Sequence, residues 1–209
     1  MAQGLQEGTL LHHGKYRNIR ILGQGGFGIT YLTFDIERSY YVAIKEYFPT
    51  SLCNRKGTTN SIQTTHDNNL NLVQKGKNRF IKEARNLHRL HNTQIVKVYA
   101  AFEENRTAYY VMEYIDGVSL YHYVQERGPL NEKEALNFLT KIAKAVEFIH
   151  FNNFTHYDLK PKNIMIRNIN HDLVLIDFGL SKQFDEKGEA TSTMMYAHSE
   201  GYSPIALYN

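Results

Sequence analysis

This sequence contains little cysteine and proline, its net charge is small, and it has no long apolar run. The single cysteine, Cys53, cannot form an internal disulfide bond. The first residues lack a cationic segment followed by an apolar run, so secretion is not indicated and we expect a cytoplasmic protein. Nowhere do about 18 apolar residues follow one another, which argues against a membrane span. A formal net charge of +3 is too small to indicate a nucleic-acid partner.

What the sequence does have is the composition of an ordinary globular protein. Its 209 residues, 42% of them hydrophobic and 22% charged, suffice for one medium domain or two small lobes with a sizeable core. No internal repeat is present, but the residue pattern changes near residue 117. We therefore predict an N-terminal extension over residues 1–15, a first lobe over 16–116 and a second lobe over 117–209.

The first lobe has the pattern of a sheet with one helix beside it. Five runs rich in β-branched and aromatic residues predict a five-stranded antiparallel sheet. Apolar residues at three- and four-residue spacing predict an amphipathic helix over Asn78–Leu90. The polar segment before this helix, Thr50–Lys77, is long for a connection, so we predict a partly mobile insert. The five strand-like runs are Tyr16–Leu22, Ile29–Phe34, Tyr40–Tyr47, Ile95–Phe102 and Thr107–Tyr114.

The second lobe is mostly helical by the same criteria. Asn131 can cap a helix, and Glu134 follows three residues later, as in a capping box. After this helix, Pro161 and several asparagines exclude a regular element, and Ile164–Arg167 and Leu173–Ile176 follow as short strands. The helix is predicted to bury one apolar stripe. The residues of that stripe are Leu139, Ile142, Ala143, Val146 and Ile149.

Three glycines, Gly23, Gly25 and Gly28, form the pattern G-x-G-x-x-G between two predicted strands. A dinucleotide-binding fold would place a helix after this pattern, but the following residues ITYLTFD are typical of a strand, so that fold is rejected. A glycine-rich hairpin remains. Its glycines either let backbone amides approach phosphate oxygens or provide a tight turn that needs a positive φ, and the pattern alone leaves both open.

One lysine, Lys45, ends the apolar strand sequence VAIK, 17 residues after Gly28. Strand lysines usually extend to the surface. The upstream glycine-rich hairpin instead favours a role for Lys45 as a point charge for nucleotide phosphates. Glu83, in the predicted helix, can pair with this lysine, although a helix glutamate considered alone is usually solvated.

The decisive stretch is the polar loop HYDLKPKN, residues 156–163, followed after a strand by Asp177-Phe178-Gly179. Taken in order, the glycine pattern, the VAIK lysine, the helix glutamate, this loop and the DFG triplet resemble the motif series of the protein-kinase family. The resemblance extends over residues 16–209, and the LKPKN loop is similar to that of serine/threonine kinases.

The resemblance implies an α+β, bilobal protein-kinase-like fold. Its N-lobe would hold a five-stranded antiparallel sheet and one helix, and its C-lobe would be mostly helical and incomplete. The implied cofactors are ATP and Mg²⁺. Asn163 and Asp177 would bind the Mg²⁺, because both offer the hard oxygen ligands that this ion prefers.

The resemblance also implies catalytic roles for four residues. Lys45 would hold the α- and β-phosphates of ATP and would be oriented by Glu83. Asp158 would accept or orient the proton of the substrate hydroxyl. Lys160, two residues further on, would place positive charge near the transferring phosphoryl group.

Other matched positions would surround the nucleotide. Met112 aligns with the residue that closes the back of the adenine pocket, and the backbone from Glu113 to Ile115 would bind the adenine edge. Ala43 and Met165 would lie on the two faces of the ring. The complete set of implied nucleotide-binding residues is Gly23, Gly25, Gly28, Thr30, Ala43, Lys45, Met112, Glu113, Ile115 and Met165.

Two departures from the family pattern bear on activity. Tyr157 stands where many kinases have an arginine that pairs with a phosphorylated activation segment, so we expect activity that does not strictly depend on such phosphorylation. Ala206 stands where the family has a glutamate, and the helices that usually complete the large lobe are missing, which would leave apolar faces uncovered. A trimmed protein, a naturally minimal kinase and a protomer completed by a partner or by self-association all remain open.

The leading hypothesis is therefore an ATP-dependent serine/threonine protein kinase of bacterial type. Its partners would be ATP and a protein substrate, with no nucleic acid and no membrane. The alternative is a nucleotide-binding scaffold, a pseudokinase-like module with little phosphotransfer, which Ala206 and the missing helices favour. A small-molecule kinase is a third hypothesis, which the glycine pattern and the LKPKN loop disfavour.

Overall fold

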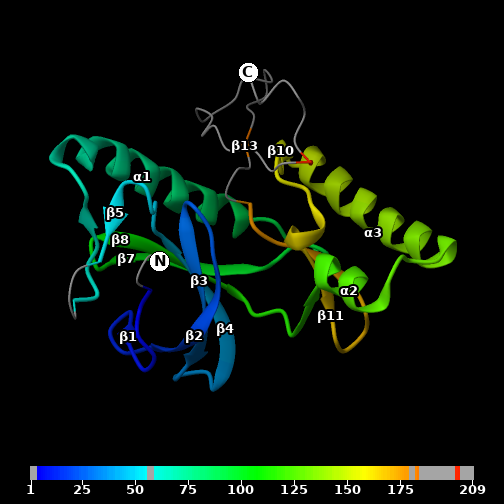
Figure 1. Cartoon of the computed structure of the whole chain (residues 1–209), viewed down its shortest axis with the longest axis horizontal. Coiled ribbons are helices and arrows are strands. Elements are labelled where there is room, and N and C mark those ends of the chain that lie inside the picture. Colours follow the sequence, from blue (N-terminus) through cyan, green and yellow to red (C-terminus); the bar gives the residue numbers. More distant parts are fainter. Residues whose placement is uncertain (1–3, 56–58, 179–181, 184–200, 203–209) are drawn as a thin grey trace. The chain divides into compact units, whose positions relative to one another are not determined.

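The computed structural model describes residues 4–55, 59–178, 182–183 and 201–202. The chain divides into two compact units, and Figure 1 labels most of their helices and strands. The first unit combines Met1–Arg89 with Val98–Tyr114, and the second combines Leu90–Lys97 with Ile115–Asn209. Gly179 and Ala206, which entered the sequence-based predictions, lie outside the described residues.

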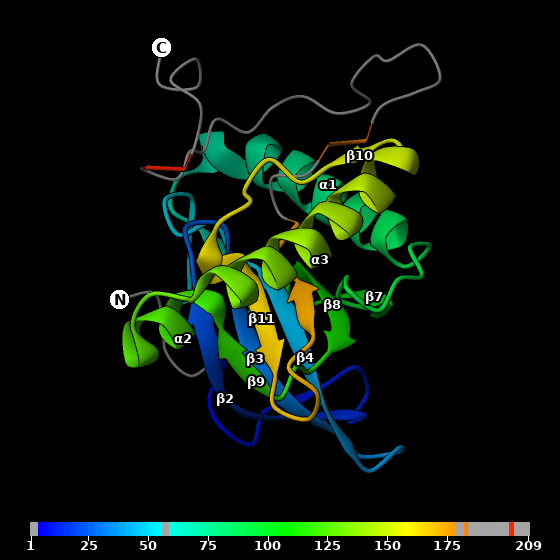
Figure 2. The same cartoon turned by 90° about the vertical axis from the view of Figure 1, so that its right-hand side faces the viewer.

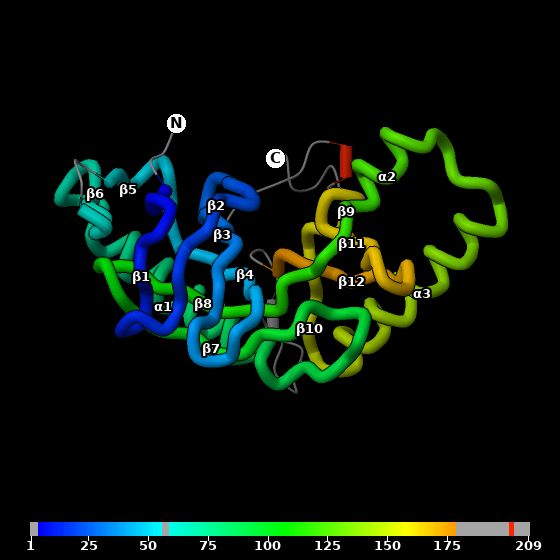
Figure 3. Tube along the Cα trace, turned by 90° about the horizontal axis from the view of Figure 1, so that it is seen from below, coloured from blue at the N-terminus to red at the C-terminus, as the bar shows by residue number. Residues whose placement is uncertain are grey.

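The first unit is built on an antiparallel sheet. Its strands are β1 (Leu10–Leu11), β2 (Tyr16–Gln24), β3 (Gly28–Asp35), β4 (Tyr40–Tyr47), β7 (Val98–Glu104) and β8 (Thr107–Glu113). They lie in the order β1-β2-β3-β4-β8-β7, as the chain trace in Figure 3 shows, and every neighbouring pair is antiparallel. The predicted five-stranded antiparallel sheet is confirmed, and the two-residue β1 extends it at one edge.

The register of β4 and β8 assigns two neighbouring charged residues to different faces of this sheet. Lys45 lies opposite Tyr110, and Glu46 lies opposite Tyr109. Because successive residues of a strand point to opposite faces, Lys45 and Tyr110 share one face, and Glu46 and Tyr109 share the other.

Helix α1 (Leu70–Leu87) packs on the Lys45 face, where its Phe80 ring lies 4.8 Å from the Tyr110 ring. The helix begins eight residues earlier than the predicted start at Asn78, so the first two turns occupy the end of the segment assigned to the polar insert. Asn69, which precedes the helix, makes no side-chain capping bond, so the sequence carries no clear start signal there.

Strand β7 also differs from its prediction, since it begins at Val98 and not at Ile95. The residues just before it pair with strand β12 (Leu173–Leu175) of the second unit instead. Leu175 N donates to Gln94 O at 2.8 Å, and Val96 N donates to Leu175 O at 3.0 Å. These bonds explain why Leu90–Lys97 belongs to the second unit.

The described part of the polar insert is folded. Strand β5 (Cys53–Asn54) pairs with β6 (Gln63–Thr64), and a 3₁₀ turn, η1 (Asp67–Asn69), leads into α1. Arg55 and Ile62 of this segment are buried. The polar composition of the segment did not indicate that Arg55 and Ile62 are buried, because the burial of each depends on a partner elsewhere in the chain.

Cys53 makes the stability of the first unit sensitive to alkali. The thiol is 2% exposed, and burial raises its pKa from 9.0 to about 11. The unfolded chain therefore releases this proton at a lower pH than the folded protein, so unfolding becomes more favourable as the pH rises. We expect the melting temperature, followed by circular dichroism, to fall as the pH rises from 9.0 to about 11.

The matched variant for this prediction is Cys53→Ala, which has no thiol to titrate. Burial also raises the pKa of Tyr31 and of Tyr109, so these tyrosines produce part of the alkaline decrease in both proteins. We expect a smaller decrease in the variant, and identical decreases would contradict the assignment to Cys53.

The described part of the second unit contains a three-stranded sheet, a two-stranded sheet and the helices α2 and α3, and Figure 2 labels most of these elements. The three-stranded sheet has the antiparallel order β12-β11-β9. The predicted strands after the catalytic-loop sequence and the predicted helix after Asn131 are confirmed. The elements other than β12 are β9 (Gly117–Ser119), α2 (Leu120–Arg127), α3 (Glu132–Phe151), β10 (Phe154–Thr155), η2 (Pro161–Asn163), β11 (Ile164–Arg167) and β13 (Lys182–Gln183), which pairs with β10.

Helix α3 begins with the predicted capping arrangement. Glu134 N donates to Asn131 Oδ1 at 2.9 Å, and Asn131 Nδ2 donates to Glu134 Oε2 at 2.7 Å. Both partners come from one short stretch of sequence, which is why the sequence alone predicts this start.

The predicted buried stripe of α3 is confirmed only in part. Phe138 and Ala145 are buried, whereas Leu139 is 61% exposed and Phe151 is also exposed. A helix with apolar residues on more than one side offers no single stripe that periodicity can identify. Of the predicted stripe, Ile149 is buried, Ile142 and Val146 are half-buried, and Leu139 and Ala143 are exposed. Within the described ranges, none of the helices is both long enough and apolar enough to span a membrane.

Candidate functional site

Asp158 is the centre of a hydrogen-bond cluster in the loop between β10 and β11. Lys160 Nζ donates to both carboxylate oxygens, at 2.7 Å to Oδ2 and 3.0 Å to Oδ1. Asn163 Nδ2 donates to Oδ2 and to the backbone oxygen of Asp158, each at 2.9 Å. The Asp158 side chain is 10% exposed and that of Lys160 is 22% exposed. Two side chains of the same loop thus orient one carboxylate.

His156 fastens this loop to the segment that follows β12. Asp158 N donates to His156 Nδ1 at 3.3 Å, so Nδ1 is the acceptor nitrogen. Nε2 then carries the hydrogen and donates to the backbone oxygen of Ile176 at 3.1 Å. The buried ring also lies 4.5 Å from the Phe178 ring. These contacts give His156 a structural role in the loop.

Two residues of this region have left-handed backbone conformations, Tyr157 at φ 59° and Asp177 at φ 60°. Such angles are unfavourable for residues with a β-carbon and persist where surrounding contacts fix the backbone. One such contact is the bond from Ile176 N to Asn163 O at 2.9 Å, which joins the loop to the residue before Asp177. Among the described residues, no group of three or more histidine, cysteine, aspartate or glutamate side chains has a metal-binding arrangement.

The three glycines of the first unit lie in or beside the turn between β2 and β3, and their surroundings differ. None of them has a positive φ, so the turn does not need glycine for its backbone angles. A Cβ added at Gly23 or Gly25 would meet no atom within 4 Å. At Gly28 the added Cβ would lie 2.5 Å from the backbone oxygen of Glu46. Gly23 and Gly25 therefore leave open space, whereas Gly28 permits the close pairing of β3 and β4.

Lys45 Nζ lies 5.8 Å from the centroid of the Tyr110 ring. That distance is within the range of a cation–π contact. Phe80 of α1 packs against the same ring, and Glu83 follows Phe80 by about one helical turn. Both Lys45 and Glu83 are half-buried. The predicted lysine and glutamate thus lie on elements that pack together around Tyr110.

The residues implied for nucleotide binding are distributed over both units. Ala43 and Met112 lie directly opposite each other in β4 and β8, and both are buried. Thr30 of β3 lies directly opposite Lys45. The first unit holds Gly23, Gly25, Gly28, Thr30, Ala43, Lys45, Met112 and Glu113, and the second unit holds Ile115 and Met165.

The model of the protein kinase domain matches residues 16–204 of this sequence. The chain belongs to the protein kinase family. It is 33% identical to the serine/threonine-protein kinase PrkC of Bacillus subtilis over 168 residues, which is 80% of this chain and 23% of the relative. It is 37% identical to serine/threonine-protein kinase D of a Synechocystis species over 173 residues, which is 81% of this chain and 30% of the relative.

A solved kinase-like structure described as the PpkA-294 apo form has a TM-score of 0.77 and 32% sequence identity. The similarity covers 84% of this chain and 62% of that one. The α+β kinase fold expected from the motif series is thereby confirmed. The chain spans less than a third of the length of the two curated relatives above.

One group of buried polar residues was not predicted from the sequence. Glu46, directly after Lys45, is fully buried and bonded to Tyr31, Arg55 and Tyr109. The sequence did contain a signal for this group. Ile44, Glu46 and Phe48 alternate along the strand, so Glu46 shares an otherwise apolar face, opposite to the face that carries Lys45. A charged residue at an otherwise apolar face predicts a buried partner, but the sequence does not identify that partner.

Proposed function

We propose that this chain is a serine/threonine protein kinase that transfers the γ-phosphoryl group of Mg-ATP to a hydroxyl of a protein substrate. The observation that carries the proposal is the Asp158 carboxylate, which Lys160 and Asn163 hold in one orientation. A carboxylate positioned in this way suits the acceptance of a hydroxyl proton. The serine/threonine preference is supported by the names of the relatives.

The remaining polar residues suit charge stabilisation. Lys160 would place positive charge near the transferring phosphoryl group, and Lys45 would bind the α- and β-phosphates. Glu83 would orient Lys45, which is supported by its position about one helical turn after Phe80, the residue whose ring packs on Tyr110 beside Lys45. The open space at Gly23 and at Gly25 would let backbone amides approach the phosphates.

Asp177 and Asn163 would hold Mg²⁺ through oxygen atoms, which this ion prefers. Because Asn163 Nδ2 donates to Asp158, the ligand atom of Asn163 would be Oδ1. When bound, Mg²⁺ neutralises charge on the phosphates. The residues proposed to contact the adenine are Ala43, Met112, Met165 and the backbone from Glu113 to Ile115.

One observation favours a second function, a nucleotide-binding scaffold with little phosphotransfer. Leu139 and Phe151 of α3 are exposed apolar residues, and Leu136 is exposed as well. An apolar helix face of this kind is typical of a surface that another element or protein covers. In the scaffold function, nucleotide binding would persist while phosphotransfer would be slow.

Transfer of radiolabelled γ-phosphate from Mg-ATP to the chain itself and to a generic serine/threonine substrate separates the two functions. We expect labelling by the wild type and a loss of roughly a hundredfold in Lys45→Met. Lys77→Met is the control, because Lys77 forms a surface ion pair with Glu103 in the same unit. Absence of label together with a rise in melting temperature on adding Mg-ATP would reject the kinase and support the scaffold.

A further inference from the structure

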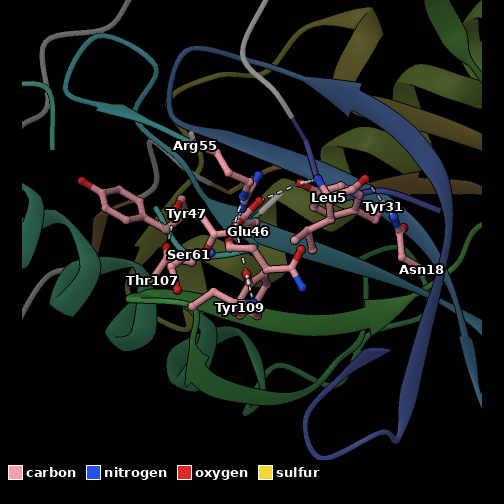
Figure 4. Close-up of polar contacts among 12 residues, drawn as sticks. Leu5, Asn18, Tyr31, Glu46, Tyr47, Arg55, Ser61, Thr107 and Tyr109 are labelled. Carbon is pink, nitrogen blue, oxygen red and sulfur yellow. Dashed lines mark hydrogen bonds and ion pairs between the residues drawn. The ribbon is translucent and has the colours of Figure 1, made fainter. Parts of the chain in front are cut away.

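A buried carboxylate lies on the face of the first unit's sheet that does not carry Lys45. Glu46 is 0% exposed, and Figure 4 shows the donors that surround it. Tyr31 Oη donates to Oε2 at 2.6 Å, and Tyr109 Oη and Arg55 Nη2 donate to Oε1 at 2.9 Å and 2.5 Å. Burial raises the pKa of the Glu46 carboxyl, and the three donors oppose that rise. Since an isolated buried carboxylate is very costly, these bonds fix its position.

Arg55 connects this carboxylate to the folded insert. Its side chain is 3% exposed, and Nε donates to the backbone oxygen of Asn60 at 2.8 Å. The guanidinium also lies 5.1 Å from the centroid of the Phe48 ring, which is within cation–π range. Arg55 therefore ties the insert both to the end of β4 and to Phe48, two residues beyond Glu46.

The segment held by Arg55 contacts the tip of the glycine-rich turn. Phe48 N donates to Phe27 O at 2.9 Å, and Thr50 N donates to Gly26 O at 3.0 Å. These two bonds continue beyond the last ladder pair of β3 and β4, which is Gly28 opposite Tyr47. Phe48 is fully buried, so its backbone position follows from the packing around it. The carbonyls of Gly26 and Phe27 are thus held by backbone that Arg55 and Phe48 anchor.

We infer that Arg55 and Glu46 are positioning residues for the glycine-rich turn, and that they tune its affinity for the phosphates of a nucleoside triphosphate. The ion pair fixes the Phe48–Thr50 backbone, and this backbone holds the turn where its amides can meet phosphate oxygens. A turn that is already ordered loses less conformational entropy when the nucleotide binds. The identity of the ligand, but not the contact to the turn, rests on the proposed function.

The test combines amide hydrogen exchange without nucleotide and steady-state kinetics of the full chain. In Arg55→Met we expect the Phe48 and Thr50 amides to exchange at least about tenfold faster, because local opening becomes easier. We expect the KM for ATP to rise by about fivefold to a hundredfold, with kcat changed less than about twofold. The double variant Glu46→Gln, Arg55→Met leaves no unpaired buried charge, and we expect it to fold and show both effects.

Lys15→Met is the matched control. Lys15 also pairs with a glutamate, Glu37, and lies over an aromatic ring, at 5.7 Å from Tyr16, but its ion pair is at the surface. We expect wild-type exchange and KM in this variant. The inference is overturned if the double variant keeps the Phe48 and Thr50 amides protected, or if its KM for ATP stays at the wild-type value.

These readouts separate the inference from the proposed function. If the wild type transfers no phosphate, the kinase proposal fails, while amide exchange and the dissociation constant of Mg-ATP still decide the positioning role. A wild type that binds no Mg-ATP would overturn both.

Discussion

Asp158→Asn should reduce phosphotransfer by roughly a hundredfold to ten-thousandfold, while the protein remains folded. An asparagine side chain has nearly the same shape but cannot accept a proton from a substrate hydroxyl. It also presents an NH₂ group or one oxygen to Lys160 and Asn163, which both donate to the native carboxylate. The measurement is kcat for labelled phosphate transfer, together with the melting temperature and the KM for ATP.

Asp172→Asn is the matched control for this variant. Asp172 belongs to the same unit and pairs with Lys141 at 2.6 Å, but this ion pair is partly exposed. Partly exposed ion pairs contribute little to the stability of the fold, so we expect the kcat of Asp172→Asn to lie within about twofold of the wild-type value. Wild-type turnover in Asp158→Asn would show that this carboxylate is not the group that handles the hydroxyl proton.

A single methyl group added at Gly28 should destabilise the fold, by roughly 1–3 kcal/mol or somewhat more. The added Cβ would lie 2.5 Å from the backbone oxygen of Glu46, and a strand carbonyl cannot rotate away as a side chain can. The strands β3 and β4 would have to separate locally, next to Lys45. Chemical denaturation of Gly28→Ala and wild type measures this loss of free energy of unfolding.

Gly25→Ala provides the contrast within the same turn. The methyl group there would meet no atom within 4 Å, so we expect unchanged stability. If the backbone of this turn binds phosphates, the same methyl group should raise the KM for ATP, because it occupies the space that the phosphates approach. Equal losses of stability in the two variants would contradict the structural distinction between the two glycines.

The features that could be predicted from the sequence depend on residues close together in the chain. Asp158, Lys160 and Asn163 lie within six residues of one another, so the loop motif itself brings them into contact. The capping pair Asn131 and Glu134 is equally local. Strands with strong β-propensity were also predicted well, because their residue pattern is repeated over several positions.

The predictions that failed depended on distant partners. No side-chain cap marks the start of α1 at Leu70, and the first residue that this helix buries is Val73. The segment before β7 pairs with Leu175, which is about eighty positions further along the chain. The buried side of α3 was predicted only in part, because several sides of the helix are apolar and the tertiary neighbours determine which of them is buried.

The sequence by itself determined the family, through motifs whose order and chemistry are legible without coordinates. Only the tertiary structure decided that Glu46 is buried, that Arg55 of the insert is its partner and that Gly28 has a packing role distinct from that of Gly25. The physical reason is that burial and ion pairing are properties of two surfaces brought together. The sequence of one strand or one loop does not identify the distant residues that bury it or pair with it.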